Sequence, residues 1–67
     1  MTVFVNDQVQ DLPPQFTLIA LLSQLSLDEQ KGIAVAVNNK VIPKNNWNAH
    51  LLSEQDKVAI IRASQGG

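Results

Sequence analysis

One segment of this chain has a helical pattern of apolar residues, and it constrains the fold more than any other feature of the sequence. Four leucines recur at the i, i+3, i+4, i+7 spacing that lines one face of an α-helix: Leu18, Leu21, Leu22 and Leu25. Thr17 can cap this helix, and Phe16 can pack back onto Leu21 as a hydrophobic staple. A single amphipathic helix cannot bury its own apolar face, so the rest of the chain must supply a layer that covers it.

The segments on either side of this helix alternate like β-strands, so the predicted covering layer is a sheet. Residues 2–6 and 9–12 alternate on the two sides of the polar pair Asp7-Gln8, which predicts an N-terminal β-hairpin that turns at this pair. The second strand must end at Pro13-Pro14, because proline lacks the amide hydrogen that a strand ladder needs.

Three more strands are predicted after the helix, which should end between Ser26 and Lys31. Asn38-Asn39 tolerates the left-handed backbone of a tight turn, and residues 44–50 indicate an irregular or single-turn helical crossover. The predicted strands cover residues 33–37, 41–42 and 57–62.

The order β-β-α-β-β-β indicates an α+β fold of the β-grasp (ubiquitin-like) type. We expect a mixed sheet of four to five strands with one main helix packed across one face, and the first and last strands paired in parallel at its centre. A chain of 67 residues is expected to form a single domain over residues 1–67, with a flexible C-terminal tail at 64–67.

Charge and composition exclude several classes of function. Five Lys and Arg residues stand against six Asp and Glu residues, for a net charge of −1, and the basic residues are scattered, so we expect no nucleic-acid partner. The absence of cysteine excludes a disulfide framework, a thiolate metal site and a cysteine nucleophile. No long apolar run or signal peptide is present, so we expect a cytoplasmic protein without a membrane partner.

Side chains that could carry chemistry are few. His50 is the single histidine, and no nucleophile, base or set of metal ligands lies near it in the sequence. Glycine occurs only at positions 32, 66 and 67, which provides no phosphate cradle. Trp47 is predicted to cover one end of the core. We therefore expect no catalytic residue, no metal site and no cofactor bound by this chain.

The terminal pair Gly66-Gly67 is the sequence's clearest functional signal. Its reactive group would be the α-carboxylate, which resists attack until transfer to AMP from ATP makes it a mixed anhydride that a thiolate or persulfide can displace. Glycine has no Cβ, so such a tail could enter a narrow channel. This pattern indicates a carrier in which sulfur would sit on the carbonyl of Gly67.

Three segments of the chain resemble the ThiS family, the ubiquitin-like sulfur carriers of thiamine (thiazole) biosynthesis. The segments are residues 33–38, residues 41–47 with the following Leu51 or Leu52, and residues 62–67. The most distinctive is the segment with valine or isoleucine, proline, a basic residue, any two residues and tryptophan, which ends at Trp47. Its occurrence together with a terminal diglycine makes the resemblance specific.

The resemblance implies a protein cosubstrate and not an enzyme. Gly67 would be adenylated by an E1-like adenylyltransferase (ThiF-type) that uses ATP and magnesium. It would then receive sulfur from a cysteine desulfurase or another sulfur donor, and as a thiocarboxylate it would supply thiazole synthase (ThiG-type). Gly66 would be its neighbour in the channel, and the free chain is expected to be a monomer.

Strand alternation also predicts an apolar patch on the sheet face away from the helix. The residues expected there are Phe4, Ala34, Ala36, Ala59 and Ile61. The residues expected to face the helix are Met1, Val3, Val5, Ile33, Val35, Val37, Val58 and Ile60. An outward Phe beside an outward Ile is typical of a docking surface, so we expect this patch to seat the adenylating enzyme.

Two positions depart from the family pattern. Glu54-Gln55-Asp56 stands where the family commonly has an acidic residue, glycine and aspartate, and Ser64 replaces a more usual apolar residue. The alternatives are a molybdopterin-synthase small subunit (MoaD-like) and a protein modifier that forms isopeptide bonds through Gly67. A third is a non-catalytic β-grasp binding module, for example for RNA, in which the diglycine is incidental.

Overall fold

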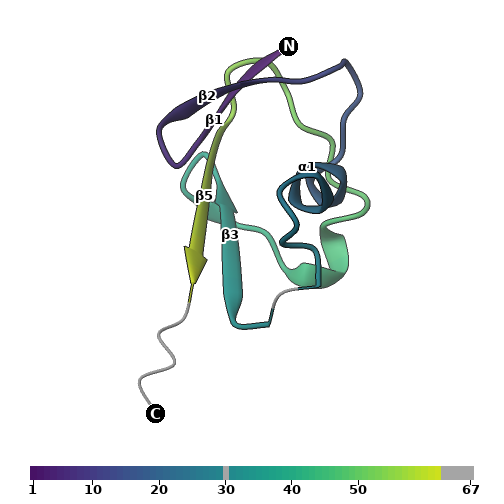
Figure 1. Ribbon diagram of the computed structural model, residues 1–67, viewed down its shortest axis with the longest axis vertical. Coiled ribbons are helices and arrows are strands. Elements are labelled where there is room, and N and C mark those ends of the chain that lie inside the picture. Colours follow the sequence, from purple (N-terminus) through teal and green to yellow (C-terminus); the bar gives the residue numbers. More distant parts are fainter. Residues whose placement is uncertain (30, 63–67) are drawn as a thin grey trace.

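Five strands form one mixed sheet in the order β2-β1-β5-β3-β4, and helix α1 lies across one face of it (Figure 1). The computed structural model describes residues 1–29 and 31–62. The elements in chain order are β1 (Thr2–Val5), β2 (Gln8–Asp11), α1 (Leu18–Gln24), β3 (Ile33–Val37), β4 (Lys40–Val41), the 3₁₀ turn η1 (Lys44–Asn46) and β5 (Lys57–Arg62).

The pairing of the strands confirms the predicted β-grasp fold. β5 lies at the centre of the sheet, where it runs parallel to β1 and antiparallel to β3. β1 pairs with β2 and β3 pairs with β4 as antiparallel hairpins. The first and last strands therefore meet in the interior of the sheet, as the sequence predicts.

Both hairpins turn on residues with left-handed backbone conformations. Asn38 and Asn39 have φ angles of 52° and 70°, and this turn lies where it is predicted. The first hairpin turns at Asn6 and Asp7, with φ angles of 49° and 68°, so the predicted turn at Asp7-Gln8 is wrong by one residue. Asn and Asp tolerate positive φ better than Gln does, and two positive φ angles match the twist of a two-residue hairpin.

Helix α1 begins where the sequence predicts and ends earlier. The Thr17 side chain caps it by accepting a hydrogen bond from the Ala20 backbone N–H, at 3.2 Å. After Leu25, Ser26 takes a φ angle of 63°, and the Leu27 N–H donates to the Leu22 carbonyl at 2.7 Å. This is the Schellman arrangement that ends helices, and it stops α1 at Gln24, before the predicted range.

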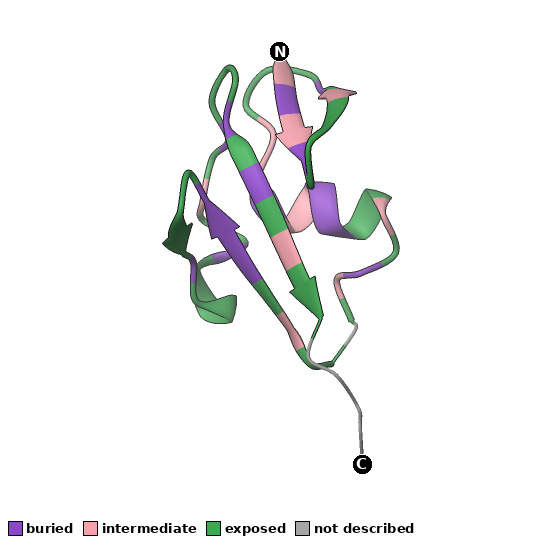
Figure 2. Cartoon of the chain, turned by 90° about the vertical axis from the view of Figure 1, so that its left-hand side faces the viewer, coloured by how far each residue is buried: buried purple, intermediate pink, exposed green. Residues whose placement is uncertain are grey.

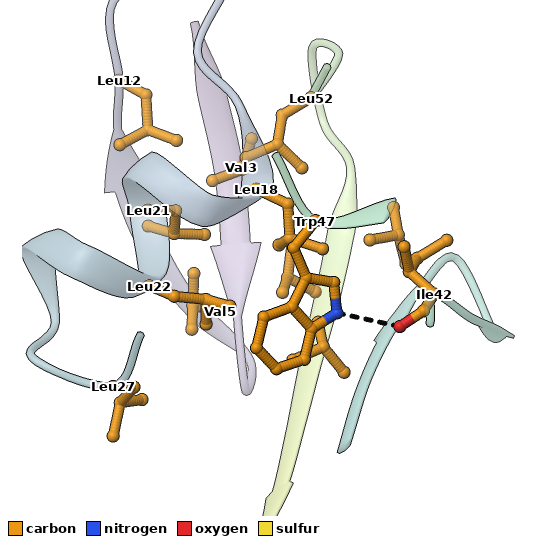
Figure 3. Packing of buried hydrophobic residues seen from close by; sticks show 13 residues of the cluster. Val3, Val5, Leu12, Leu18, Leu21, Leu22, Leu27, Ile42, Trp47 and Leu52 are labelled. Carbon is orange, nitrogen blue, oxygen red and sulfur yellow. Dashed lines mark hydrogen bonds between the residues drawn. The ribbon is translucent and has the colours of Figure 1, made fainter. Parts of the chain in front are cut away.

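One hydrophobic core lies between α1 and the sheet (Figure 3). The strand residues predicted to face the helix are all in this core or packed against it. Trp47 is 2% exposed, and its indole Nε1–H donates to the Ile42 carbonyl at 2.9 Å (Figure 3). The prediction that Trp47 covers the core is confirmed, and its hydrogen bond satisfies the buried indole N–H.

Backbone hydrogen bonds join the crossover after β4 to the first turn of α1. The Leu18 N–H donates to the His50 carbonyl at 2.8 Å, and the Ile19 N–H donates to the Trp47 carbonyl at 3.0 Å. These bonds satisfy two of the amides that a helix leaves free in its first turn. In the part of the chain that the structure describes, no helix is long and apolar enough to cross a membrane.

Candidate functional site

The last strand leads along the sequence toward Gly67, the predicted sulfur-bearing residue. β5 ends at Arg62, and it points away from the end of the molecule where the N-terminus lies (Figure 1). Gly66 and Gly67, together with Ser64, lie outside the described residues. The structure therefore describes the part of the site that precedes the tail, which is the central strand β5 and the surface around it.

Along β5, buried and exposed residues alternate in the first half of the strand (Figure 2). Val58 and Ile60 face α1, whereas Ala59 and Ile61 face away from it. The register places Ala34 opposite Ile61 and Ala36 opposite Ala59. The structure thus brings the predicted outward residues of β3 and β5 together on one face of the sheet.

The outward face is wider than the sequence predicts. Val9 lies opposite Phe4 in the first hairpin, and Val41 lies opposite Ala36 in the second. Both valines are 65% exposed. With them, the outer patch spans all five strands of the sheet, and we use this name for the following residues: Phe4, Val9, Ala34, Ala36, Val41, Ala59 and Ile61.

Members of the outer patch differ in how much surface they offer. Ile61 is 56% exposed, and Phe4 is half-buried. Ala36 is only 8% exposed although it lies outside the core cluster, between Val41 and Ala59 on the same face. Ala36 therefore adds little surface. A hollow of about 300 Å³ beside Phe4 is lined in part by Asn39, Lys57 and Ala59.

The predicted hairpins already place both valines on this face, so the sequence could have identified them. A turn at Asp7-Gln8 pairs Val9 with Asn6, whereas the observed turn at Asn6-Asp7 pairs it with Phe4. Asn6 and Phe4 lie in phase on one face of the first strand, so either turn puts Val9 on the outward face and only its position along the strand changes. Val41 belongs to a two-residue strand that is too short for alternation, but the predicted turn at Asn38-Asn39 pairs it with Ala36.

The two acidic residues before β5, Glu54 and Asp56, accept hydrogen bonds from backbone N–H groups. The Asp56 carboxylate accepts hydrogen bonds from the Ser53 N–H at 2.7 Å and from the Asn38 side chain at 2.9 Å. The Glu54 carboxylate accepts from the Thr2 N–H at 3.1 Å and 3.2 Å. His50 is half-buried in the crossover. Among residues 1–29 and 31–62, no three potential metal ligands come together.

The backbone conformation of Gln55 explains how the chain accommodates glutamine where the family commonly has glycine. Its φ angle is 66°, which is the left-handed conformation that glycine adopts most easily. The turn between Ser53 and β5 therefore keeps the geometry that a glycine would give, and Asp56 still closes it. The other departure, at Ser64, lies outside the described residues.

Comparisons with known proteins agree with this geometry. The sequence model of the ThiS family matches residues 3–67. The chain is 30% identical, over the full length of both proteins, to the Escherichia coli (strain K12) protein named sulfur carrier protein ThiS. Its fold is similar to the crystal structure of the thiamine biosynthesis protein ThiS from Geobacter metallireducens, with a TM-score of 0.84, 22% identity and full coverage of both chains.

A solution structure of a thiamine biosynthesis protein from Geobacter metallireducens has the same fold. The TM-score is 0.77 at 23% identity, and the match covers all of this chain and 88% of the other. At this identity, the two solved structures support the fold.

Proposed function

Because this chain belongs to the ThiS family, we propose that it is a sulfur carrier of thiamine biosynthesis and that Gly67 is the residue that carries the sulfur. The observation that carries this proposal is the family match over residues 3–67, which runs through the terminal diglycine. The relative of equal length, named as a sulfur carrier, supports the same role. The match favours this role over a MoaD-like carrier, an isopeptide-forming modifier or an RNA-binding module.

The proposed chemistry takes place at the carboxylate of Gly67. The carboxylate oxygen attacks the α-phosphate of ATP and releases pyrophosphate, which makes an acyl adenylate. A persulfide on the sulfur donor then displaces AMP, and a second thiol cleaves the S–S bond, forms a disulfide with the donor and leaves a thiocarboxylate on Gly67. In this scheme the chain is a protein substrate, and the ATP and magnesium are bound by the activating enzyme.

The place of β5 in the sheet supports this use of the tail. β5 pairs with β1 at its start, at Lys57 and Val58, and with β3 from Val58 to Arg62, so the strand before the tail is fixed within the sheet. A fixed base limits the conformations that must be ordered when a partner takes up the tail. We propose one domain over residues 1–67, monomeric when free, that presents the tail in turn to a ThiF-type enzyme, a sulfur donor and a ThiG-type synthase.

We assign docking of the E1-like enzyme to the outer patch. Single exposed apolar residues are common on protein surfaces, but a contiguous set across central strands is typical of an interaction surface. Val9, Val41 and Ile61 are among the most exposed large apolar residues of the described chain, and all three lie on this face. Gly67, which follows the end of β5 by five residues in the sequence, would then reach the nucleotide of the docked enzyme.

The proposed function can be tested by intact-mass measurement. The chain is incubated with ATP, magnesium, an E1-like enzyme and a sulfur source, and its mass is then measured. We expect a gain equal to the exchange of one oxygen for one sulfur, localised to Gly67 by fragmentation. An unchanged mass in an assay that loads the Escherichia coli relative would contradict the proposal.

A further inference from the structure

Two asparagines at hairpin turns contact β5 through their side-chain amides. At the start of the strand, the Asn38 Oδ1 accepts from the Lys57 N–H at 2.9 Å, and its Nδ2 donates to Asp56 at 2.9 Å. Near the end of the strand, the Asn6 Oδ1 accepts from the Ile60 N–H at 2.8 Å, and its Nδ2 approaches the Ile60 carbonyl at 3.4 Å. Each amide holds β5 from a different neighbouring hairpin.

The Asn6 amide continues the parallel ladder after β1 has ended. β1 pairs with β5 as far as Val5 opposite Val58, and the Asn6 backbone N–H then donates to the Val58 carbonyl at 2.9 Å. The chain turns at Asn6, so no further β1 backbone can pair with Ile60. The side-chain amide replaces the missing strand residue, and it does so two residues before β5 ends at Arg62.

From this contact we infer that Asn6 is a positioning residue for the activation of Gly67. The inference rests on the proposed function. On the side of β5 that faces β1, the Ile60 backbone groups are held by the Asn6 amide, whereas Ile61 pairs toward β3. Without the amide, the last part of β5 is held from one side only. Each residue that loosens must be ordered again when the tail enters the enzyme, which weakens productive binding.

The test substitution is Asn6→Gly, because glycine keeps the left-handed turn and removes only the amide. We expect the KM of the E1-like enzyme for this carrier to rise by about 5- to 10-fold, with kcat changed by less than about 2-fold, because the effect is on ordering and not on the reacting atoms. Amide hydrogen exchange at Ile60 should become about 10-fold faster, because the local structure there opens more easily.

Two matched variants separate positioning from general destabilisation. Gln15→Gly makes the same kind of change at another exposed left-handed turn residue, with φ of 60°, which lies away from the outer patch. No side-chain hydrogen bond within the described ranges involves Gln15, so this variant should leave KM and exchange unchanged. Asn38→Gly removes the amide at the other end of β5. It should lower thermal stability and speed exchange at Lys57 without raising KM, when assayed at a temperature where it stays folded.

Several results would overturn the inference. The inference fails if Asn6→Gly speeds amide exchange at Ile60 but keeps the native KM. It also fails if Asn38→Gly raises KM as much as Asn6→Gly does. A raised KM without faster exchange would mean that Asn6 touches the enzyme directly.

If Asn6→Gly fails to fold, Asn6→Asp retains the acceptor for the Ile60 N–H, and its KM should lie closer to the native value than that of Asn6→Ala. If the native chain is not adenylated at all, the proposed function fails as well. If the native chain and Asn6→Gly are both adenylated with the same KM, only the inference about Asn6 fails.

Discussion

At the scale of single residues, turns in this protein are made with little glycine. Within residues 1–29 and 31–62, the non-glycine residues with positive φ are Asn6, Asp7, Gln15, Ser26, Asn38, Asn39 and Gln55, whereas Gly32 is the one glycine. A left-handed backbone costs a residue with a Cβ about 1–2 kcal/mol, and less for Asn and Asp. Asn6 and Asn38 offset this cost through side-chain hydrogen bonds to β5.

Ser26 is a position where glycine should stabilise the protein. Ser26 sits at the left-handed position that ends α1, so Ser26→Gly should raise the free energy of unfolding by about 1 kcal/mol. Ser23→Gly is the matched control, since Ser23 is an exposed residue inside the helix, where replacing serine by glycine should cost about 0.5 kcal/mol. Urea unfolding measures both values. If both variants lose stability equally, the described end of α1 is wrong.

Trp47 is assigned to the core and not to sulfur transfer. Its indole is buried and donates to the Ile42 carbonyl, so Trp47→Ala should lower the free energy of unfolding by about 3–5 kcal/mol. That is a large share of the stability of a small domain. Circular dichroism against temperature should show the loss. A variant as stable as the parent that no longer accepts sulfur would show instead that Trp47 contacts a partner.

At the scale of elements, the central strands were the easiest to predict. β3 and β5 have the predicted bounds, because β-branched residues recur at every second position and both strands lie inside the sheet. β4 begins and ends one residue earlier than predicted, and the Ile42 carbonyl accepts from Trp47 after the strand has ended. The end of α1 was missed because Ser26 gives no glycine signal.

Parts of the candidate site were also predictable. Five members of the outer patch follow from strand alternation, since a strand's face depends only on its phase. Val9 and Val41 lie on the edge strands, and their face follows from the pairing of each hairpin and not from alternation within one strand. The Asn6 contact with Ile60 joins residues 54 apart in sequence, and no local pattern predicts it.

The outer patch gives a prediction at this scale. Phe4→Ser combined with Ile61→Ser should leave the fold intact, because neither residue belongs to the buried core cluster, and should raise the KM for adenylation by about 10-fold or more. Leu51→Ser is the control, since Leu51 is 57% exposed but lies in the crossover, away from this face. Unchanged adenylation by the folded double variant would show that the enzyme docks elsewhere.

At the scale of the whole molecule, the account assigns folding and chemistry to different parts of the chain. The core joins α1, the crossover and the sheet, and its residues run from Val3 to Val58. The proposed reaction uses only Gly67. Deleting Gly67, or adding one residue after it, should therefore abolish activation and leave the melting temperature nearly unchanged. Deletion shortens the reach of the tail, and extension displaces the carboxylate from the α-phosphate.

The most direct test of the account is a chain in which the Gly67 carboxylate is replaced by a carboxamide. The backbone stays the same length, but the anionic oxygen that attacks the α-phosphate of ATP is gone. With the E1-like enzyme and a sulfur source, we expect the native chain to release pyrophosphate and gain sulfur, and the amidated chain to do neither. An amidated chain that still supports pyrophosphate release and accepts sulfur at its C-terminus would contradict the account.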